Sequence, residues 1–209
     1  IHGYIESILD NPNMSAEKRQ HFLERCYTQS ERLNKLLMDM AQLTRLEETP
    51  TLSSEDTKEI SNVDIVPIIK NVLDDTALQL NEKGIQSIVS LPDKIIIPSP
   101  LTEPEEVLYS VFRNLVDNTI FYATGATKIN ITYDDEEFSF SDDGIGVEPK
   151  HLPYLFERFY RVDKGRSRKM GGTGLGLAIV KNAITAHGGS ISAHTTPGGG
   201  LTIKFAFSK

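Results

Sequence analysis

The chain has 209 residues, of which 39% are hydrophobic and 24% charged, a composition typical of a soluble globular protein. The 29 acidic residues outnumber the 22 Lys and Arg, and the formal charge of -7 argues against nucleic-acid binding through a basic surface. No apolar run approaches the roughly 20 residues of a membrane-spanning helix, so we expect no membrane contact by this part. The single cysteine, Cys26, excludes an intramolecular disulfide and a cysteine-rich zinc site.

The N-terminal residues 1–48 predict a helical hairpin. Residues 1–10 carry apolar side chains at helical spacing, and Asn11-Pro12-Asn13 interrupts them. Residues 15–48 lack Gly and Pro, and Ser15 is placed to cap this second helix. Apolar residues at alternating four- and three-residue steps form a seam for helix packing: Cys26, Leu33, Leu37 and Met40. A self-contained two-helix unit is an alternative, but we favour a dimeric four-helix bundle whose first helix is truncated, because one long helix and a short one cannot bury so long a seam by themselves.

A polar stretch over residues 49–61 predicts a linker, and residues 62–209 have the size of one domain. We expect helices at residues 63–82, 104–122 and 175–187. Strands are expected at 85–91, 128–133, 137–141, 190–194 and 201–207. Thr102 and Glu105 form a candidate capping box before the second of these helices. The alternation in several strands indicates an α+β fold, a two-layer α/β sandwich with a mixed, mainly antiparallel sheet and helices on one face.

Asn114 and Asn118 lie four residues apart, on one face of a predicted helix. Amide oxygens can ligate Mg²⁺ beside phosphate oxygens and water, although such a pair taken alone more often marks a polar helix edge.

Two glycine-containing segments follow. Asp142-Asp143-Gly144-Ile145-Gly146 comes after an alternating strand, where a carboxylate can accept a hydrogen bond from an amine. Residues 171–176 read GGTGLG and run into a helix, whose free backbone N–H groups can bind an anion. Neither the P-loop nor the dinucleotide-binding fingerprint fits these residues.

A third segment lies between the two glycine stretches. Phe156 and Phe159 can hold a mobile segment against the body of the domain, while Arg161 and the basic residues 164–169 can contact phosphate oxygens. We interpret it as a lid.

The ordered set of residues 114–118, 142–146, 156–159 and 172–177 resembles the four motifs of the catalytic domain of sensor histidine kinases. These belong to the ATPase group that includes gyrase, Hsp90-type chaperones and MutL. The helical hairpin extends the resemblance to nearly the whole chain and argues against a steady ATPase of the gyrase or chaperone type.

The resemblance implies Mg-ATP binding and transfer of the γ-phosphoryl group to a histidine of the bundle. Asp142 would accept from the adenine amino group, Asn118 would ligate Mg²⁺ and act in catalysis with Arg161, and Asn114 would support Asn118. The remaining implied nucleotide-binding residues are Tyr122, Gly144, Gly146, Tyr160, Gly172, Thr173, Gly174, Leu175, Gly176 and Leu177.

Two departures from the family pattern stand out. The family often has Lys three residues after the second asparagine, and Phe121 occupies that position here. The acceptor histidine is expected upstream of Ile1, since His2 lacks the acidic residue and Pro that follow an acceptor. Phe121 keeps open an alternative, a nucleotide-binding regulatory or phosphatase-dominant module without kinase activity.

The resemblance also implies partners and a location. The partners are a second copy of the chain and the receiver domain of a response regulator, whose aspartate takes the phosphoryl group. The location is the cytoplasmic portion of a bacterial inner-membrane sensor.

Overall fold

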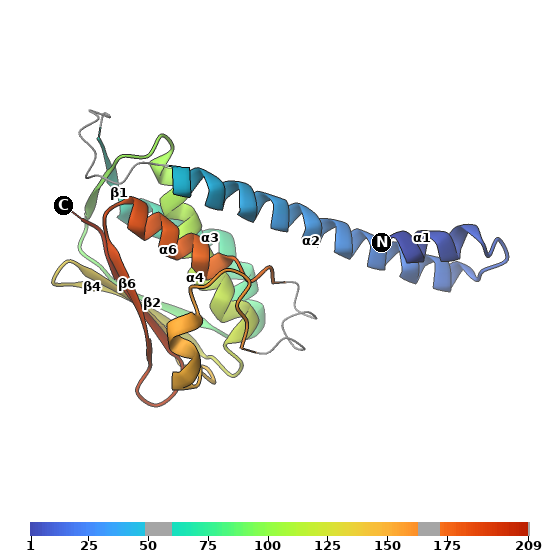
Figure 1. The fold of residues 1–209 in the computed structure, drawn as a ribbon. Coiled ribbons are helices and arrows are strands. Elements are labelled where there is room, and N and C mark those ends of the chain that lie inside the picture. The colour runs from blue at the N-terminus through green and yellow to red at the C-terminus, as the bar shows by residue number, and fades with distance from the viewer. Residues whose placement is uncertain (49–59, 163–171, 209) are drawn as a thin grey trace.

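The computed structural model describes residues 1–48, 60–162 and 172–208. A helical hairpin opens the chain, with α1 at His2–Leu9 and α2 at Ala16–Glu48. The Ser15 hydroxyl accepts a hydrogen bond from the Lys18 N–H at 3.3 Å, which confirms the predicted cap. Figure 1 shows α2 extending far beyond the rest of the molecule, with α1 folded back along its free end. No helix of the described residues is long and apolar enough to span a membrane.

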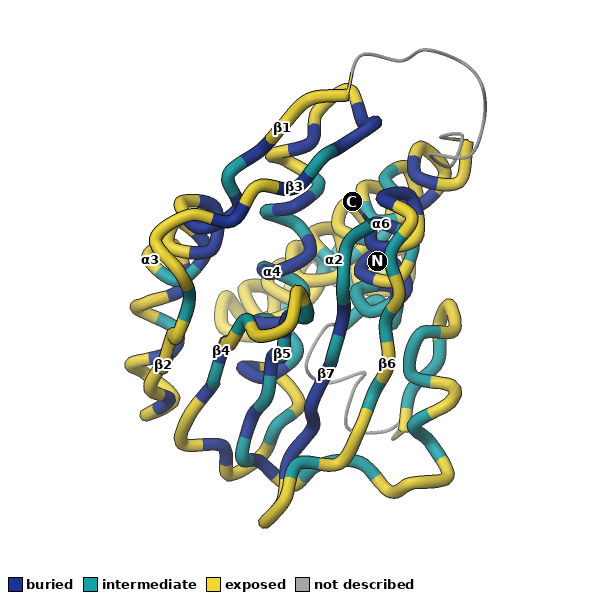
Figure 2. The backbone as a smooth tube through the Cα atoms, turned by 90° about the vertical axis from the view of Figure 1, so that its left-hand side faces the viewer, coloured by how far each residue is buried: buried dark blue, intermediate teal, exposed yellow. Residues whose placement is uncertain are grey.

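The C-terminal part is a sheet covered by helices. The main sheet has the order β2-β4-β5-β7-β6, in which β2 and β4 are parallel and every other pair is antiparallel. Its strands are β2 (Gln86–Ser90), β4 (Lys128–Asp134), β5 (Glu137–Asp142), β6 (Ser190–Thr195) and β7 (Leu201–Ala206). Figure 2 shows these strands in front of the helices, so the helices cover one face only. The predicted α+β sandwich with a mainly antiparallel sheet is confirmed.

Three helices cover the sheet, and their ends follow from local sequence. They are α3 (Ile65–Lys83), α4 (Pro104–Tyr122) and α6 (Gly176–Ala186). Asp64 caps α3 by accepting from the Val66 N–H at 3.2 Å. Pro104 opens α4, where a missing N–H has no cost. The N-cap of α4 is Glu103, without a side-chain cap bond, so the predicted capping box of Thr102 and Glu105 is wrong.

Three short elements were not predicted. Strands β1 (Ser61–Asp64) and β3 (Ile96–Ser99) form a separate antiparallel ribbon, and a 3-10 helix, η1, spans Pro149–Tyr154. Most of the predicted linker, residues 49–59, lies outside the described residues, and β1 begins at its last residue, Ser61.

The core lies between the sheet and its helices. Phe138 of β5 stacks on Phe205 of β7 with ring centroids 5.2 Å apart, and Phe112 of α4 meets both rings edge-on. These three side chains are at most 1% exposed. The strand period of two that buries Phe138 and Phe140 continues to the end of β5 and buries Asp142 on the same face.

Helix α2 uses two faces. Leu43 and Leu46 are buried, and this C-terminal half of α2 packs on α6. Three residues of the predicted seam, Leu33, Leu37 and Met40, are about half exposed. The apolar seam is therefore separate from the face that contacts the sheet domain.

Candidate functional site

The centre of the candidate site is Asp142, at the end of β5. Its side chain is 2% exposed, and Oδ1 accepts hydrogen bonds from the backbone N–H groups of Gly144 at 2.9 Å and Leu201 at 3.4 Å. Oδ2 receives no hydrogen bond from the described residues. Burial raises the pKa of Asp142, while the two backbone N–H groups lower it. The arrangement fixes Oδ1 and leaves Oδ2 available to accept from an amine.

Gly200, just before β7, lies against the backbone of Asp142. Its φ is +102°, and a Cβ added there would overlap the carbonyl oxygen of Asp142. Only glycine combines this conformation with this close approach. The sequence reasoning missed Gly200 and the Leu201 N–H, although the run of three glycines at 198–200 was a visible signal.

Asp143, next in the chain, has a different role. Its carboxylate accepts from the N–H groups of Thr127 at 2.8 Å and Lys128 at 2.9 Å and from the Thr127 hydroxyl at 2.6 Å. Burial raises its pKa, but these hydrogen bonds outweigh burial and lower it to about 2. Asp143 therefore ties the end of β5 to the start of β4.

The predicted glycine turn after Asp142 meets the C-terminal end of α4. A Cβ on Gly144 would lie 2.8 Å from Ala123 Cβ, and the Ile145 N–H donates to the Thr124 carbonyl at 2.9 Å. Gly146 has a φ of +69° and faces the backbone of Gly200. This turn thus connects Asp142 to the helix that carries the asparagines.

The second glycine segment meets the same helix. A Cβ on Gly176 would lie 2.8 Å from Asn114 Oδ1, and one on Gly172 would overlap the Tyr122 hydroxyl. Asn114 donates from Nδ2 to the Ser110 carbonyl at 2.8 Å, which directs Oδ1 toward the start of α6. The Asn118 side chain makes no hydrogen bond with the described residues. Its amide oxygen is available as a ligand.

Leu175 and Leu177 belong to the core rather than to a polar surface. Leu175 is fully buried, and Leu177 is partly buried against the same cluster. Their contribution to a binding site is restricted to backbone groups at the N-terminus of α6. The Thr173 hydroxyl accepts from the Leu175 backbone N–H at 3.3 Å and donates to Asp39 of α2 at 2.6 Å.

The structure describes the first part of the predicted lid, up to Val162, whereas its basic residues 164–169 lie outside the described residues. The Phe159 N–H donates to the Gly174 carbonyl at 2.9 Å, so the lid and the glycine segment are joined. A Cβ on Gly174 would lie 3.2 Å from Arg161 Nε, which places Arg161 at the glycine segment. The Tyr160 hydroxyl instead pairs with His151 Nδ1 of η1 at 2.6 Å.

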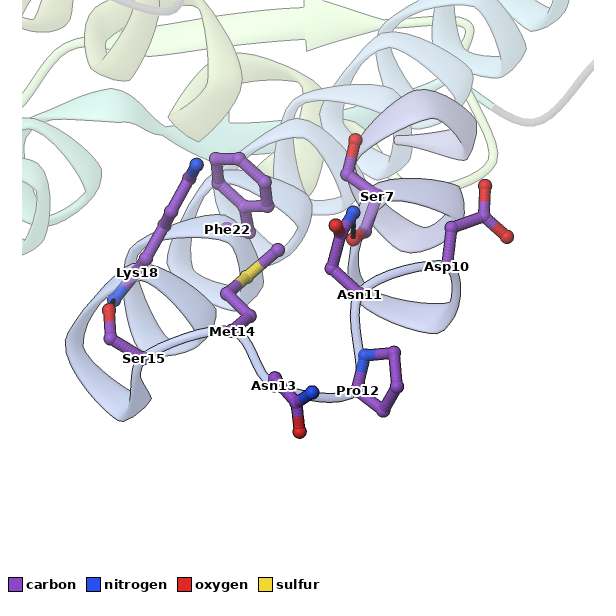
Figure 3. Close-up of a pocket in the computed structure, with 9 residues that line it drawn as sticks. All are labelled: Ser7, Asp10, Asn11, Pro12, Asn13, Met14, Ser15, Lys18 and Phe22. Atoms are coloured by element: carbon purple, nitrogen blue, oxygen red, sulfur yellow. Dashed lines mark hydrogen bonds between the residues drawn. The ribbon is translucent and has the colours of Figure 1, made fainter.

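A hollow of about 550 Å³ lies elsewhere, at the turn between α1 and α2. Figure 3 shows Asn11 bonded to the Ser7 backbone there, with Asp10 on one side of the turn and Lys18 on the other. No set of functional groups of the kind found around Asp142 converges on this hollow. Among the described residues, no group of three or more His, Cys, Asp or Glu side chains is arranged to hold a metal ion.

Comparison with known proteins assigns the fold to a family. Residues 103–209 match the family described as histidine kinase-, DNA gyrase B- and HSP90-like ATPase. The chain belongs to this ATPase family. Similar proteins within this family include named sensor proteins. The phosphate regulon sensor protein PhoR of Pseudomonas aeruginosa is 36% identical over the whole chain, and sensor histidine kinase WalK of Bacillus subtilis is 31% identical over 98% of it.

The catalytic domain is that of a sensor histidine kinase, although the chain spans only 46% of PhoR and 33% of WalK. Solved structures agree on the fold. Acinetobacter baumannii histidine kinase AdeS covers the whole chain with a TM-score of 0.70 at 20% identity, and the chain covers 93% of that structure. Full-length ShkA in complex with AMPPNP covers 98% of the chain with a TM-score of 0.68 at 25% identity, and the chain covers 42% of it.

Proposed function

We propose that this chain is the ATP-binding portion of a protein histidine kinase in a two-component system. Asp142 carries the proposal, because a buried carboxylate with one oxygen fixed and the other available suits the amino group of adenine. The ShkA structure, which was solved with AMPPNP, supports a nucleotide at this fold.

The residues around Asp142 fit the rest of Mg-ATP. Mg²⁺ prefers oxygen ligands and takes only one or two from protein, and the Asn118 amide oxygen is available for this. Asn114 and the backbone N–H groups of residues 172–177 surround the start of α6, where the helix dipole favours phosphate. Arg161 lies at the same place and would neutralise charge that develops during phosphoryl transfer.

In the proposed reaction, a neutral imidazole nitrogen attacks the γ-phosphorus, an N–P bond forms and the bond to the ADP oxygen breaks. We propose that the acceptor histidine is not His2, which is exposed and pairs with Glu6 at 3.1 Å. A version of the protein extended upstream should label its own histidine from ATP, and His2→Gln should leave that labelling unchanged. Label at His2 would overturn this assignment.

The nucleotide site is tested by calorimetry with a non-hydrolysable ATP analogue, with and without Mg²⁺. We expect Mg²⁺-dependent binding by the unmodified chain and its loss in Asp142→Ala. Asp134→Asn, an exposed position on β4 of the same sheet, is the matched control and should bind normally. Equal binding by the Asp142→Ala variant and the unmodified chain would contradict the proposed site.

We also propose that the chain dimerises through α2 and passes its phosphoryl group to the receiver domain of a response regulator. The half-exposed Leu33, Leu37 and Met40 support a helix-packing seam. The sensor names of PhoR and WalK support a cytoplasmic position beside a membrane sensor, where ATP is available. Sedimentation that shows a monomer at all concentrations, or an unchanged dimer in Leu37→Glu, would count against this seam.

A further inference from the structure

Two side-chain contacts join helix α2 to α4 in an antiparallel sense. Gln42 donates to the Ser110 hydroxyl at 2.8 Å, and Lys35 pairs with Asp117 at 3.6 Å. From the first contact to the second, the residue number falls by seven in α2 and rises by seven in α4, so the two helices run in opposite directions. One further turn along the same register brings Arg32 opposite the C-terminal end of α4, which carries Phe121 and Tyr122 of the candidate site.

The same face of α2 also passes the N-terminus of α6. Asp39 accepts from the Thr173 hydroxyl at 2.6 Å, and Asn182 donates to Glu47 at 3.1 Å, so α2 and α6 run in the same direction. Arg32 lies seven residues before Asp39, about 10 Å farther along the helix axis and on the same face. Arg32 therefore lies beyond the N-terminal end of α6, where backbone N–H groups can bind an anion.

The electrostatics of Tyr122 agree with this placement of Arg32. The Tyr122 hydroxyl contacts Gly172, at the start of the glycine segment. Burial raises the pKa of Tyr122, and the positive charges of Arg161 and Arg32 act in the opposite direction. The phenol is therefore under the influence of two guanidinium groups, Arg161 from the lid and Arg32 from α2.

Two neighbouring residues, Lys35 of α2 and Phe121 of α4, differ from Arg32 in pairing and in charge. Lys35 pairs with Asp117, and Phe121 carries no charge. Arg32 is half-buried and makes no ion pair with the described residues. A half-buried guanidinium beyond an anion-binding helix end, with no acidic partner in the described part of the chain, suits a phosphate group.

We propose that Arg32 binds the terminal phosphates of the nucleotide, so that α2 forms one wall of the triphosphate site. This inference rests on the proposed function, because it assumes a nucleoside triphosphate with its base at Asp142. It goes further in assigning a phosphate ligand to the helical hairpin rather than to the ATPase domain. Triphosphate binding then favours docking of α2 against α4 and α6.

Calorimetry on the full chain tests the inference with two ligands, a non-hydrolysable ATP analogue with Mg²⁺ and adenosine. In Arg32→Ala we expect the ATP analogue to bind about 10-fold more weakly, which is typical of losing one charge-assisted phosphate contact. Adenosine should bind as it does to the unmodified chain. Arg32→Lys should recover part of the loss, since a point charge remains without the guanidinium fork. Arg25→Ala, one heptad farther from the site on the same helix, should change the ATP-analogue Kd less than about twofold.

Each other outcome overturns the inference. Normal ATP-analogue binding by Arg32→Ala, while Asp142→Ala binds none, would show that Arg32 is not a ligand and would leave the proposed function standing. Equal losses for adenosine and the ATP analogue would assign Arg32 a role in folding or docking instead. If the unmodified chain bound no ATP analogue, the proposed function would fail and this inference with it.

Discussion

Replacement of Asp143 by Ala should weaken the fold and spare the nucleotide site. The Asp143 carboxylate joins β5 to β4 through three hydrogen bonds from Thr127 and Lys128. Asp142 makes its two hydrogen bonds within the candidate site instead. The two adjacent aspartates therefore differ in role. Asp143→Ala should lower stability and keep ATP-analogue binding, whereas Asp142→Ala should lose that binding.

The size of the Asp143 effect follows from its pKa. Lowering the pKa from 3.8 to about 2 corresponds to at most about 2.5 kcal/mol of folding free energy. Because the carboxylate is partly exposed to solvent, screening reduces this to about 1 kcal/mol. A loss of that size lowers the melting temperature of a chain of this length by about 2–4 °C.

Thermal unfolding followed by circular dichroism measures this difference. Since the folded-state pKa is depressed, the contribution of Asp143 is present above about pH 4 and is lost as pH falls toward about 2. Asp143→Ala and the unmodified chain should therefore differ at pH 7 and converge at acid pH. Asp143→Asn, which retains an acceptor oxygen, should lose less. Unchanged melting at pH 7, or a loss of ATP-analogue binding as large as that of Asp142→Ala, would refute this reasoning.

Three further predictions concern other parts of the molecule. Phe138→Ala should lower the free energy of unfolding by about 3–5 kcal/mol in urea titrations, because it empties a fully buried position between Phe112 and Phe205; a loss below about 1 kcal/mol would contradict the described core. Gly200→Ala should abolish ATP-analogue binding in calorimetry, because its Cβ overlaps Asp142, whereas Gly198→Ala, which also has positive φ but open space around it, should bind normally; normal binding by both variants would be the contrary result. Burial raises the pKa of Asp39, although the Thr173 hydrogen bond opposes this, so the folded state loses stability as pH rises through the range between its unfolded and folded pKa values. Asp39→Asn should accordingly melt higher than the unmodified chain at pH 7 and equally below about pH 3, and a lower melting temperature at pH 7 would reverse that conclusion.

The parts of the fold that the sequence predicts correctly are those with a regular pattern of apolar residues. Helix α4 was placed at its observed bounds because Pro104 marks its start and apolar residues recur along one face. The position of Asp142 also follows from pattern, since the alternation of β5 puts it on the buried face beside Phe140. Strand β3 was not predicted, because Pro98 argues against a central strand. In the structure, β3 pairs only with β1 in a two-stranded ribbon, where a proline is tolerated.

The docking of α2 could not be read from the sequence. The contact between Asp39 and Thr173 joins residues 134 positions apart. It consists of one polar pair, which produces no periodic signal in either segment. The buried Leu43 and Leu46 continue the helical pattern of α2, but that pattern does not distinguish a partner helix in a second copy from α6 of the same chain.

The pairing of β5 with β7 has a consequence for how the chain can vary. Phe138 is directly opposite Phe205, so both ends of the intervening segment are held side by side in the middle of the sheet. These two ends lie 67 residues apart along the chain. The entropic cost of closing a segment grows by only about 0.6 kcal/mol for each doubling of its length. Insertions or deletions outside the helices and strands of this segment should therefore change the unfolding equilibrium little.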